Sequence, residues 1–141
     1  MNKACICLGG GTISVDFELC AKMHDAILRS IEEGYTKFLC GGLGNWSFLY
    51  ASVLREYQKH GKDIHIACYI AESVNAERYR AELLKLEVYD NVYILPGKNV
   101  VETDLFLIRK CHRILVPKQC GIKNHLLLRA IHQSHKEVLL I

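Results

Sequence analysis

The sequence predicts one α/β domain with three layers, in which helices cover both faces of a mostly parallel sheet. Short apolar runs alternate with segments whose apolar residues recur every three or four positions, as strands alternate with helices. The apolar runs are continuous, which is typical of parallel strands buried on both faces. The chain has 141 residues, 50% of them hydrophobic, which suits a single domain over residues 1–141 and is too short for two ordinary ones.

The first third of the chain predicts a strand, a helix and a second strand. Residues 3–8 form an apolar run that ends in a glycine-rich turn. We expect a helix over 16–33, because Asp16 is a good N-cap and Gly34 favours an ending. The apolar run at 37–40 predicts the second strand.

The middle of the chain continues the alternation. A helix is predicted over 46–59, a strand over 63–70 and a helix over 74–86, with Ser73 as its N-cap. A fourth strand is expected over 92–95, where a Pro-Gly pair ends it.

The last third predicts two more strands and two more helices. The spacing of apolar residues favours a helix over 101–110, followed by a strand over 113–116. After a turn at 117–121 we expect a helix over 122–134 and a strand over 137–141.

The segment with the clearest chemical meaning is the glycine turn after the second strand. Gly41, Gly42 and Gly44 lie within four residues, and a helix begins at once with Asn45 or Ser47 as its polar opening. Glycine lets a backbone come close to a ligand, and a helix start offers N–H groups without internal partners, so the segment suits a phosphate. Plain turn geometry explains the local sequence equally well, since no P-loop motif is present.

Three glycine-containing turns follow predicted strands, after Leu8, after Cys40 and after Val116. In parallel α/β sheets ligands bind beyond the carboxyl ends of the strands, so these turns should converge on one site. The expected ligand-binding residues belong to these turns and to the helix starts after them: Gly9, Gly10, Gly41, Gly42, Gly44, Asn45, Trp46, Ser47, Gly121, Ile122, Lys123 and His125.

Two of these residues have strong alternative explanations. Trp46 suits stacking on a base at the mouth of the site, and it equally suits packing at a helix start or a subunit interface. His125 suits a phosphate contact or an acid–base role, although a surface or capping histidine is the more common case. Tyr69 and Glu72, after the third strand, are expected near the same rim.

The chain resembles the SLOG superfamily of Rossmann-like proteins, and within it the YpsA-like branch. Three segments carry the resemblance: residues 6–10 (ICLGG), 38–46 (FLCGGLGNW) and 111–124 (CHRILVPKQCGIKN). The resemblance covers essentially the whole chain and implies a pocket for a nucleotide or nucleotide-derived ligand. It also brings in the related Lonely Guy enzymes, which are nucleoside-monophosphate phosphoribohydrolases.

The chain differs from the family pattern at residues that bear on catalysis. The position of the Lonely Guy catalytic glutamate falls on His125, and the family's arginine has no clear counterpart near Thr103 and Asp104. Ser47 stands where an acidic residue follows the glycine segment in the family. The resemblance therefore implies phosphate binding more directly than cleavage of an N-glycosidic bond, which needs a positioned carboxylate.

Three functional hypotheses follow. The favoured one is a sensor or regulator that binds a nucleotide-derived ligand. The second is an N-glycosidic hydrolase, with Asp16, Glu72, Asp104 and His125 as the acid–base residues expected near the pocket. The third is a protein-interaction module with a vestigial pocket, and in each case a homodimer or larger homo-oligomer is compatible with the sequence.

Composition limits the partners. The formal charge is +3 with scattered basic residues, which argues against a nucleic-acid-binding arm. No apolar stretch is long enough to span a bilayer, so we expect a cytoplasmic protein with no membrane partner. The seven cysteines lie mostly in apolar runs, as reduced core residues do. No metal-ligand spacing occurs, and no cofactor is indicated.

Overall fold

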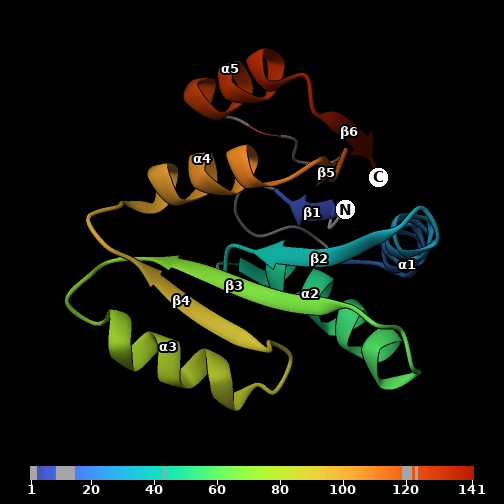
Figure 1. The fold of residues 1–141 in the computed structure, drawn as a ribbon, viewed down its shortest axis with the longest axis horizontal. Coiled ribbons are helices and arrows are strands. Elements are labelled where there is room, and N and C mark those ends of the chain that lie inside the picture. The colour runs from blue at the N-terminus through green and yellow to red at the C-terminus, as the bar shows by residue number, and fades with distance from the viewer. Residues whose placement is uncertain (1–2, 9–14, 43, 119–121, 123) are drawn as a thin grey trace.

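The computed structural model describes residues 3–8, 15–42, 44–118, 122 and 124–141. Its centre is a six-stranded sheet with the strand order β4-β3-β2-β1-β5-β6, and every paired strand is parallel. Figure 1 shows β2, β3 and β4 pointing the same way across the molecule. The strands are β1 (Lys3–Cys7), β2 (Tyr35–Cys40), β3 (His65–Ala71), β4 (Asn91–Leu95), β5 (Arg113–Val116) and β6 (Glu137–Leu140).

Five helices pack on this sheet in two layers and confirm the predicted α/β fold class. They are α1 (Phe17–Glu32), α2 (Gly44–Lys59), α3 (Ala76–Lys85), α4 (Val100–Lys110) and α5 (His125–Ser134). Buried residues of α1, α2 and α3 form one apolar cluster with the sheet, and buried residues of α4 and α5 form another on the opposite face. Figure 1 shows α4 and α5 on one side of the sheet and α3 on the other.

The continuous apolar runs of the strands are explained by this double cover. In β1, Cys5 and Cys7 face the cluster of α1 and α2, whereas Ala4 and Ile6 face the cluster of α4 and α5. Successive side chains of a strand point to opposite faces, so both sets must be apolar when both faces are buried.

The chain order of the strands reverses at β1. Strands β1, β2, β3 and β4 follow one another in chain order toward one edge of the sheet. The connection through α4 then crosses back, and β5 pairs with the other side of β1. Right-handed crossovers in opposite directions put α1 to α3 on one face and α4 and α5 on the other. The carboxyl ends of β1 and β5 therefore form the switch point at which such folds commonly bind ligands.

Two predicted helix starts are corrected by the structure. Asn75, and not Ser73, is the N-cap position of α3, and it makes no side-chain capping hydrogen bond. Helix α5 begins at His125, and not at Ile122, because the Asn124 side chain accepts hydrogen bonds from the N–H groups of Leu126 and Leu127. The predicted N-cap Asp16 of α1 is confirmed, since its carboxylate accepts from the Leu19 N–H at 2.8 Å.

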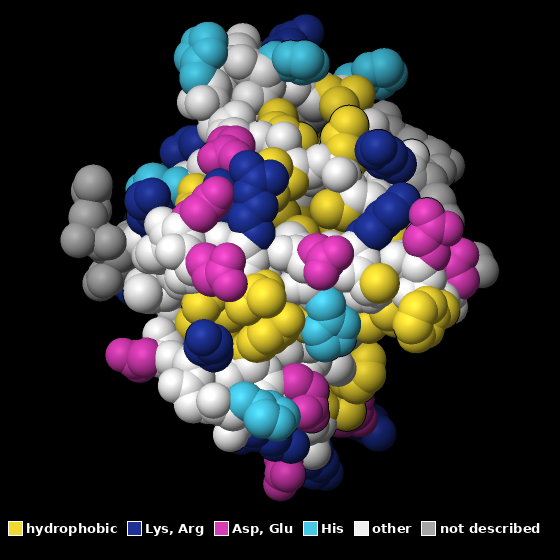
Figure 2. Space-filling view, turned by 90° about the vertical axis from the view of Figure 1, so that its right-hand side faces the viewer, with side chains coloured by type: hydrophobic (Ala, Val, Ile, Leu, Met, Phe, Trp, Pro, Cys, Tyr) yellow, Lys and Arg dark blue, Asp and Glu magenta, His cyan; other side chains and the backbone are white. Residues whose placement is uncertain are grey.

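Three further observations concern membrane-spanning helices, cysteine thiols and surface charge. Among the described residues no helix is long and apolar enough to cross a membrane. Six described cysteines are free thiols, and all but Cys20 are buried. Figure 2 shows the side of the molecule at the amino ends of the strands, where acidic, basic and histidine side chains are interspersed, so neither sign of charge dominates this face.

Candidate functional site

A cavity of about 730 Å³ lies at the carboxyl edge of the sheet, beside the switch point. Its lining on the sheet side consists of Cys7 at the end of β1, Leu8 after it, Gly41 after β2, and Ile70 and Ala71 of β3. The starts of α2, α4 and α5 close it from above and from the side. Its volume is in the range of pockets that hold small organic ligands.

The predicted glycine turn forms part of this cavity. Gly41 and Gly44 line it, and Gly44, with φ +78°, is the first residue of α2. Gly42 has φ +74°, and a Cβ atom there would lie 2.8 Å from Cys68 Sγ and 2.9 Å from Ile70 Cγ2. Gly42 is therefore required by the backbone and by packing, whereas a Cβ on Gly41 would meet only ordinary contacts, 3.7 Å from Asp104 Oδ1 and 3.9 Å from Leu107 Cδ1.

Ser47 holds the turn in place. Its buried hydroxyl accepts a hydrogen bond from the Gly42 N–H at 3.3 Å, and the residue also lines the cavity. At the position where the SLOG pattern has an acidic residue, this chain thus has a side chain that fixes the glycine backbone.

The three helix starts at the cavity differ in how they are capped. Asn99 caps α4 in a capping box with Glu102, and Asn124 caps α5. Side-chain oxygens already accept from first-turn N–H groups in both helices. The first turns of α2 and α5 contain no acidic residue, which suits the approach of an anion.

Asp104 is the most unusual side chain in the cavity. Burial raises the pKa of its carboxyl group from 3.8 to about 6, and no described residue forms a hydrogen bond or ion pair with it. It projects from α4 toward the glycine turn, where Asp104 Oδ1 is 3.7 Å from the position of a Cβ on Gly41. A half-buried, unpaired carboxyl group in a cavity is a feature typical of functional sites.

The second carboxylate of the cavity has a partner. Glu72 Oε1 accepts from the Gly97 N–H at 3.2 Å, at the rim formed by the connection after β3. Tyr79 lines the same side, and its hydroxyl donates to the carbonyl of Gly42. Tyr69, expected at this rim, instead stacks on Tyr93 with ring centroids 5.1 Å apart and packs against Phe106.

The structure brings together several of the residues predicted from the sequence. Gly41, Gly44, Trp46, Ser47 and Ile122 line the larger cavity. Trp46 is only 2% exposed and belongs to the apolar core, and its indole N–H has no hydrogen-bond partner among the described residues. Trp46 is therefore a core residue that also forms part of the cavity wall.

The other predicted residues fall elsewhere. Asn45 lies in the first turn of α2 and His125 is an exposed residue at the start of α5, and neither is among the residues that line the cavity. Asp16 is the N-cap of α1 and likewise does not line it. Gly9, Gly10, Gly121 and Lys123 lie outside the described residues.

Sequence reasoning placed Asp104 near the pocket and missed the other residues of α4 that line it. Asn99, Val100, Val101 and Thr103 all line the cavity, and the Thr103 hydroxyl donates to the Asn99 carbonyl at 2.8 Å. The capping-box pattern Asn99-x-x-Glu102 was the local signal for this helix start. The crossover from β4 back to β5 is what carries the helix over the carboxyl ends of the central strands.

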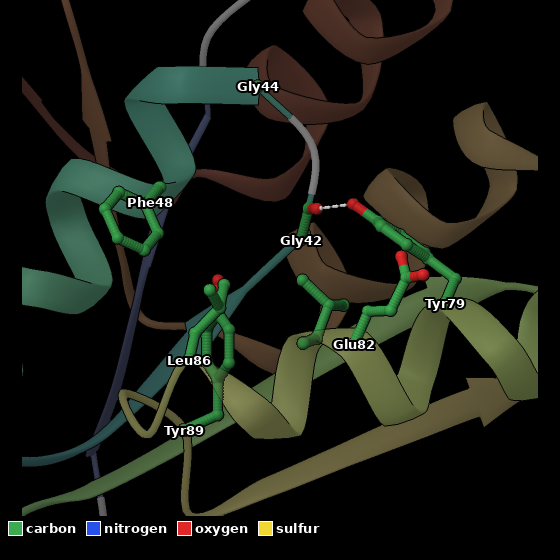
Figure 3. A pocket seen from close by; sticks show the side chains of 8 residues that line it. Gly42, Gly44, Phe48, Tyr79, Glu82, Leu86 and Tyr89 are labelled. Carbon is green, nitrogen blue, oxygen red and sulfur yellow. Dashed lines mark hydrogen bonds between the residues drawn. The ribbon is translucent and has the colours of Figure 1, made fainter.

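A second, smaller cavity of about 330 Å³ lies on the other side of the glycine turn, between α2 and α3. Figure 3 shows its walls, with Phe48 on one side, Tyr79 on the other and Tyr89 beneath. Gly44 and Tyr79 line both cavities. Figure 3 shows the hydrogen bond from the Tyr79 hydroxyl to the Gly42 carbonyl, which links the two walls at the glycine turn.

The described residues include no group of three or more His, Cys, Asp or Glu side chains that could hold a metal ion. The described lining of the larger cavity offers the backbone at the start of α2, hydroxyl and amide groups, the Cys7 thiol and the carboxyl groups of Glu72 and Asp104. A scan against models of known protein families finds no match for the chain. A search of curated proteins likewise finds no matching sequence.

Proposed function

We propose that the larger cavity binds a nucleotide or nucleotide-derived ligand, with its phosphate at the glycine turn and the first turn of α2. The observation that carries the proposal is the cavity itself, which lies at the switch point of a parallel sheet with Gly41 and Gly44 in its wall. The α2 start supplies backbone N–H groups and the positive end of the helix dipole. Its volume leaves room for a sugar and a base beside the phosphate.

The role we propose is that of a sensor or regulator, in line with the resemblance to the SLOG superfamily. Backbone donors suffice to hold a phosphate, and they tolerate the side-chain changes that separate this chain from the family pattern. The cavity is open and is not filled by described side chains, which favours ligand binding over a vestigial pocket.

The first test is thermal stability against AMP, ADP, ATP, GMP, cyclic nucleotides, NAD and ADP-ribose. A compound present at about a hundred times its dissociation constant adds roughly 2.7 kcal/mol to the free energy of unfolding, which is visible as a raised melting temperature. No shift with any of these compounds would count against the proposal.

The second test places a negative charge in the phosphate position. Gly41 lacks the positive φ of Gly42 and Gly44 and has only ordinary contacts around its added Cβ, so Gly41→Asp should fold. We expect it to weaken binding of the active compound at least about tenfold, equivalent to about 1.4 kcal/mol. The control Gln133→Glu adds the same charge in the last turn of α5 and should leave the affinity unchanged. Equal affinities of the two variants would place the phosphate elsewhere.

Asp104 favours a second candidate function, hydrolysis of the N-glycosidic bond of a nucleoside monophosphate. In that reaction water adds to the anomeric carbon, the bond to the base breaks, and the base leaves with a proton. A carboxyl group whose pKa is about 6 can take a proton from the water or give one to the base near neutral pH. The residue comes from α4 and does not occupy the position of the Lonely Guy glutamate, which falls on His125.

Release of free base from a panel of monophosphates tests this candidate. We expect any turnover to fall by two or more orders of magnitude in Asp104→Asn, with the affinity for the monophosphate retained. Turnover that survives this substitution would remove Asp104 from the mechanism. Binding without turnover at high protein concentration would leave the sensor role.

One edge of the sheet also suits the expected formation of a homodimer. Strand β6 is at one edge of the sheet, and Val138 and Leu140 are exposed on it. We propose this edge as the contact between subunits of a homodimer. Light scattering of the wild type and of Leu140→Lys would show a change from dimer to monomer, and a monomeric wild type would end the proposal.

A further inference from the structure

We propose that the smaller cavity is a second binding site, which takes a single planar aromatic ring bearing an N–H or amino donor. This site is separate from the phosphate position proposed above and does not depend on it. Its residues come from the end of the glycine turn, the first two turns of α2, the last half of α3 and the connection to β4.

The walls of the cavity select for a flat apolar group. Phe48, Tyr79, Leu83 and Leu86 surround it, and the side chains of Phe48 and Leu86 are exposed although both are large and apolar. Figure 3 shows the Phe48 ring on α2 facing Leu86 and Tyr89 across the space. Aromatic rings pack well against other rings and against flat aliphatic surfaces, so a planar ring would cover this apolar surface.

Tyr89 supplies the polar feature of the site. The residue is only 8% exposed, and among the described residues its hydroxyl has no hydrogen-bond partner. In Figure 3 its hydroxyl oxygen is directed up into the space between Phe48 and Gly42. Burial raises the pKa of Tyr89, so the hydroxyl stays protonated and can both donate and accept a hydrogen bond. The hydroxyl oxygen is not among the described buried side-chain atoms that lack a partner, so it is accessible from the cavity and can contact a ligand.

Glu82 sets the preference for a donor on the ring. Its carboxylate is on the α3 side of the cavity, near Tyr79 in Figure 3. Its ion pair with Arg78 has a distance of 3.7 Å between two exposed side chains, so the pair is weak and leaves the carboxylate available. A ring with an N–H or amino group can therefore donate a hydrogen bond to Glu82 from within the cavity.

The test uses adenine and indole as planar probes and cyclohexanol as a non-planar probe of similar size. Backbone amide resonances are followed by NMR during titration of the whole protein. We expect adenine and indole to shift the amides of Gly44, Leu86 and Tyr89, with cyclohexanol binding at least tenfold more weakly. Absence of shifts at these amides with millimolar adenine and indole would overturn the proposal.

Variants distinguish this cavity from the larger one. Leu86→Trp fills the rim from a position that is 46% exposed, so it should fold and abolish probe binding. Leu84→Trp is its matched control, because Leu84 is 36% exposed in the last turn of α3, two residues before Leu86, and does not line the cavity. Tyr89→Phe should weaken adenine binding by roughly 2- to 10-fold, the range for one neutral hydrogen bond. Probe binding lost in Gly41→Asp and kept in Leu86→Trp would place the ring in the larger cavity and refute the proposal.

Discussion

Gly41 and Gly42 have different roles in the structure, although they belong to one glycine-rich motif in the sequence. Gly41 faces the larger cavity, and Gly42 is enclosed by Cys68 and Ile70. The presence of a turn could be predicted from the glycines alone, since few other residues fit there. Which glycine serves packing and which faces a ligand depends on the neighbouring strand β3, and that pairing is not visible in local sequence.

Gly42→Ala is predicted to be strongly destabilising. The new Cβ would lie under 3.0 Å from two side-chain atoms and would also force a positive φ on alanine. We expect a loss of roughly 2–5 kcal/mol from the free energy of unfolding, the sum of overpacking and backbone strain. Gly97→Ala is the control, because Gly97 has φ +70° and open space around it. Gly97→Ala should lower the free energy of unfolding only by the cost of the positive φ, about 1–2 kcal/mol, as measured by urea denaturation. Equal losses would mean that packing around Gly42 is unimportant.

Asp104 is predicted to make the fold less stable as pH rises. Its folded-state pKa of about 6 is above the ordinary 3.8, so the folded protein holds the proton more tightly than the unfolded chain. Stability is therefore lost as pH increases from about 4 to about 6 and stays lower above that range. We expect Asp104→Asn to add on the order of 1–3 kcal/mol at pH 8 and little at pH 4.

The measurement is the free energy of unfolding of wild type and variant between pH 4 and pH 8. Asp25→Asn, on the exposed side of α1, is the control and should change stability by less than about 0.5 kcal/mol at every pH. A gain for Asp104→Asn that is the same at pH 4 and pH 8 would show that the effect is not electrostatic. A carboxyl group that lowers stability in this way is easier to explain by function than by folding.

At the scale of elements, the order of helices and strands along the chain could be predicted better than their contribution to the cavity. The order of all eleven elements follows from the alternation of apolar runs and helical periodicity. The start of α3 was misplaced because Ser73 suits an N-cap as well as Asn75 does, and the start of α5 was misplaced because the Asn124 N-cap was not recognised. Only the capping contacts of Asn124 with Leu126 and Leu127 decide the start of α5.

Helix α4 shows why part of the candidate site was missed. Its apolar residues predicted a helix, and nothing in its own sequence says that the helix crosses the sheet above the carboxyl ends of β1 and β2. That placement follows from the strand order, in which β5 pairs with β1 and not with β4. Strand order depends on contacts between residues far apart in the chain, so the contribution of Asn99, Val100, Val101 and Thr103 required the structure, whereas Asp104 was expected near the pocket from the sequence.

At the scale of the whole molecule, Arg113 ties the end of α1 to the far edge of the sheet. The side chain is 3% exposed and donates to Ser30 and Glu33 of the α1 region and to both oxygens of Glu137 on β6. Its guanidinium also lies over the Tyr35 ring at 4.6 Å. These contacts join the end of α1 to β5 and β6, which pair directly with Arg113 opposite Glu137.

This network predicts a loss of stability in acid. Hydrogen bonding to Arg113, with a smaller contribution from Arg29, holds the pKa of Glu33 below its ordinary 4.5. A group whose pKa is lower in the folded state stabilises the fold above its unfolded pKa and loses that effect as pH falls through its folded pKa. We therefore expect the melting temperature of the wild type to fall below about pH 4.5, and the difference from Arg113→Met to be largest at pH 7 and to shrink toward pH 3.

Calorimetry of both proteins between pH 3 and pH 7 measures this difference. Arg29→Met is the matched control, since Arg29 pairs with the same Glu33 at 3.1 Å from an exposed position on α1. An exposed pair contributes little, so the control should shift the melting temperature by only about 2 °C or less. If the curves of wild type and Arg113→Met ran parallel over the whole range, Arg113 would stabilise the fold by packing alone. Curves that converge in acid would show that the charge network joins α1, β5 and β6 into one cooperative unit.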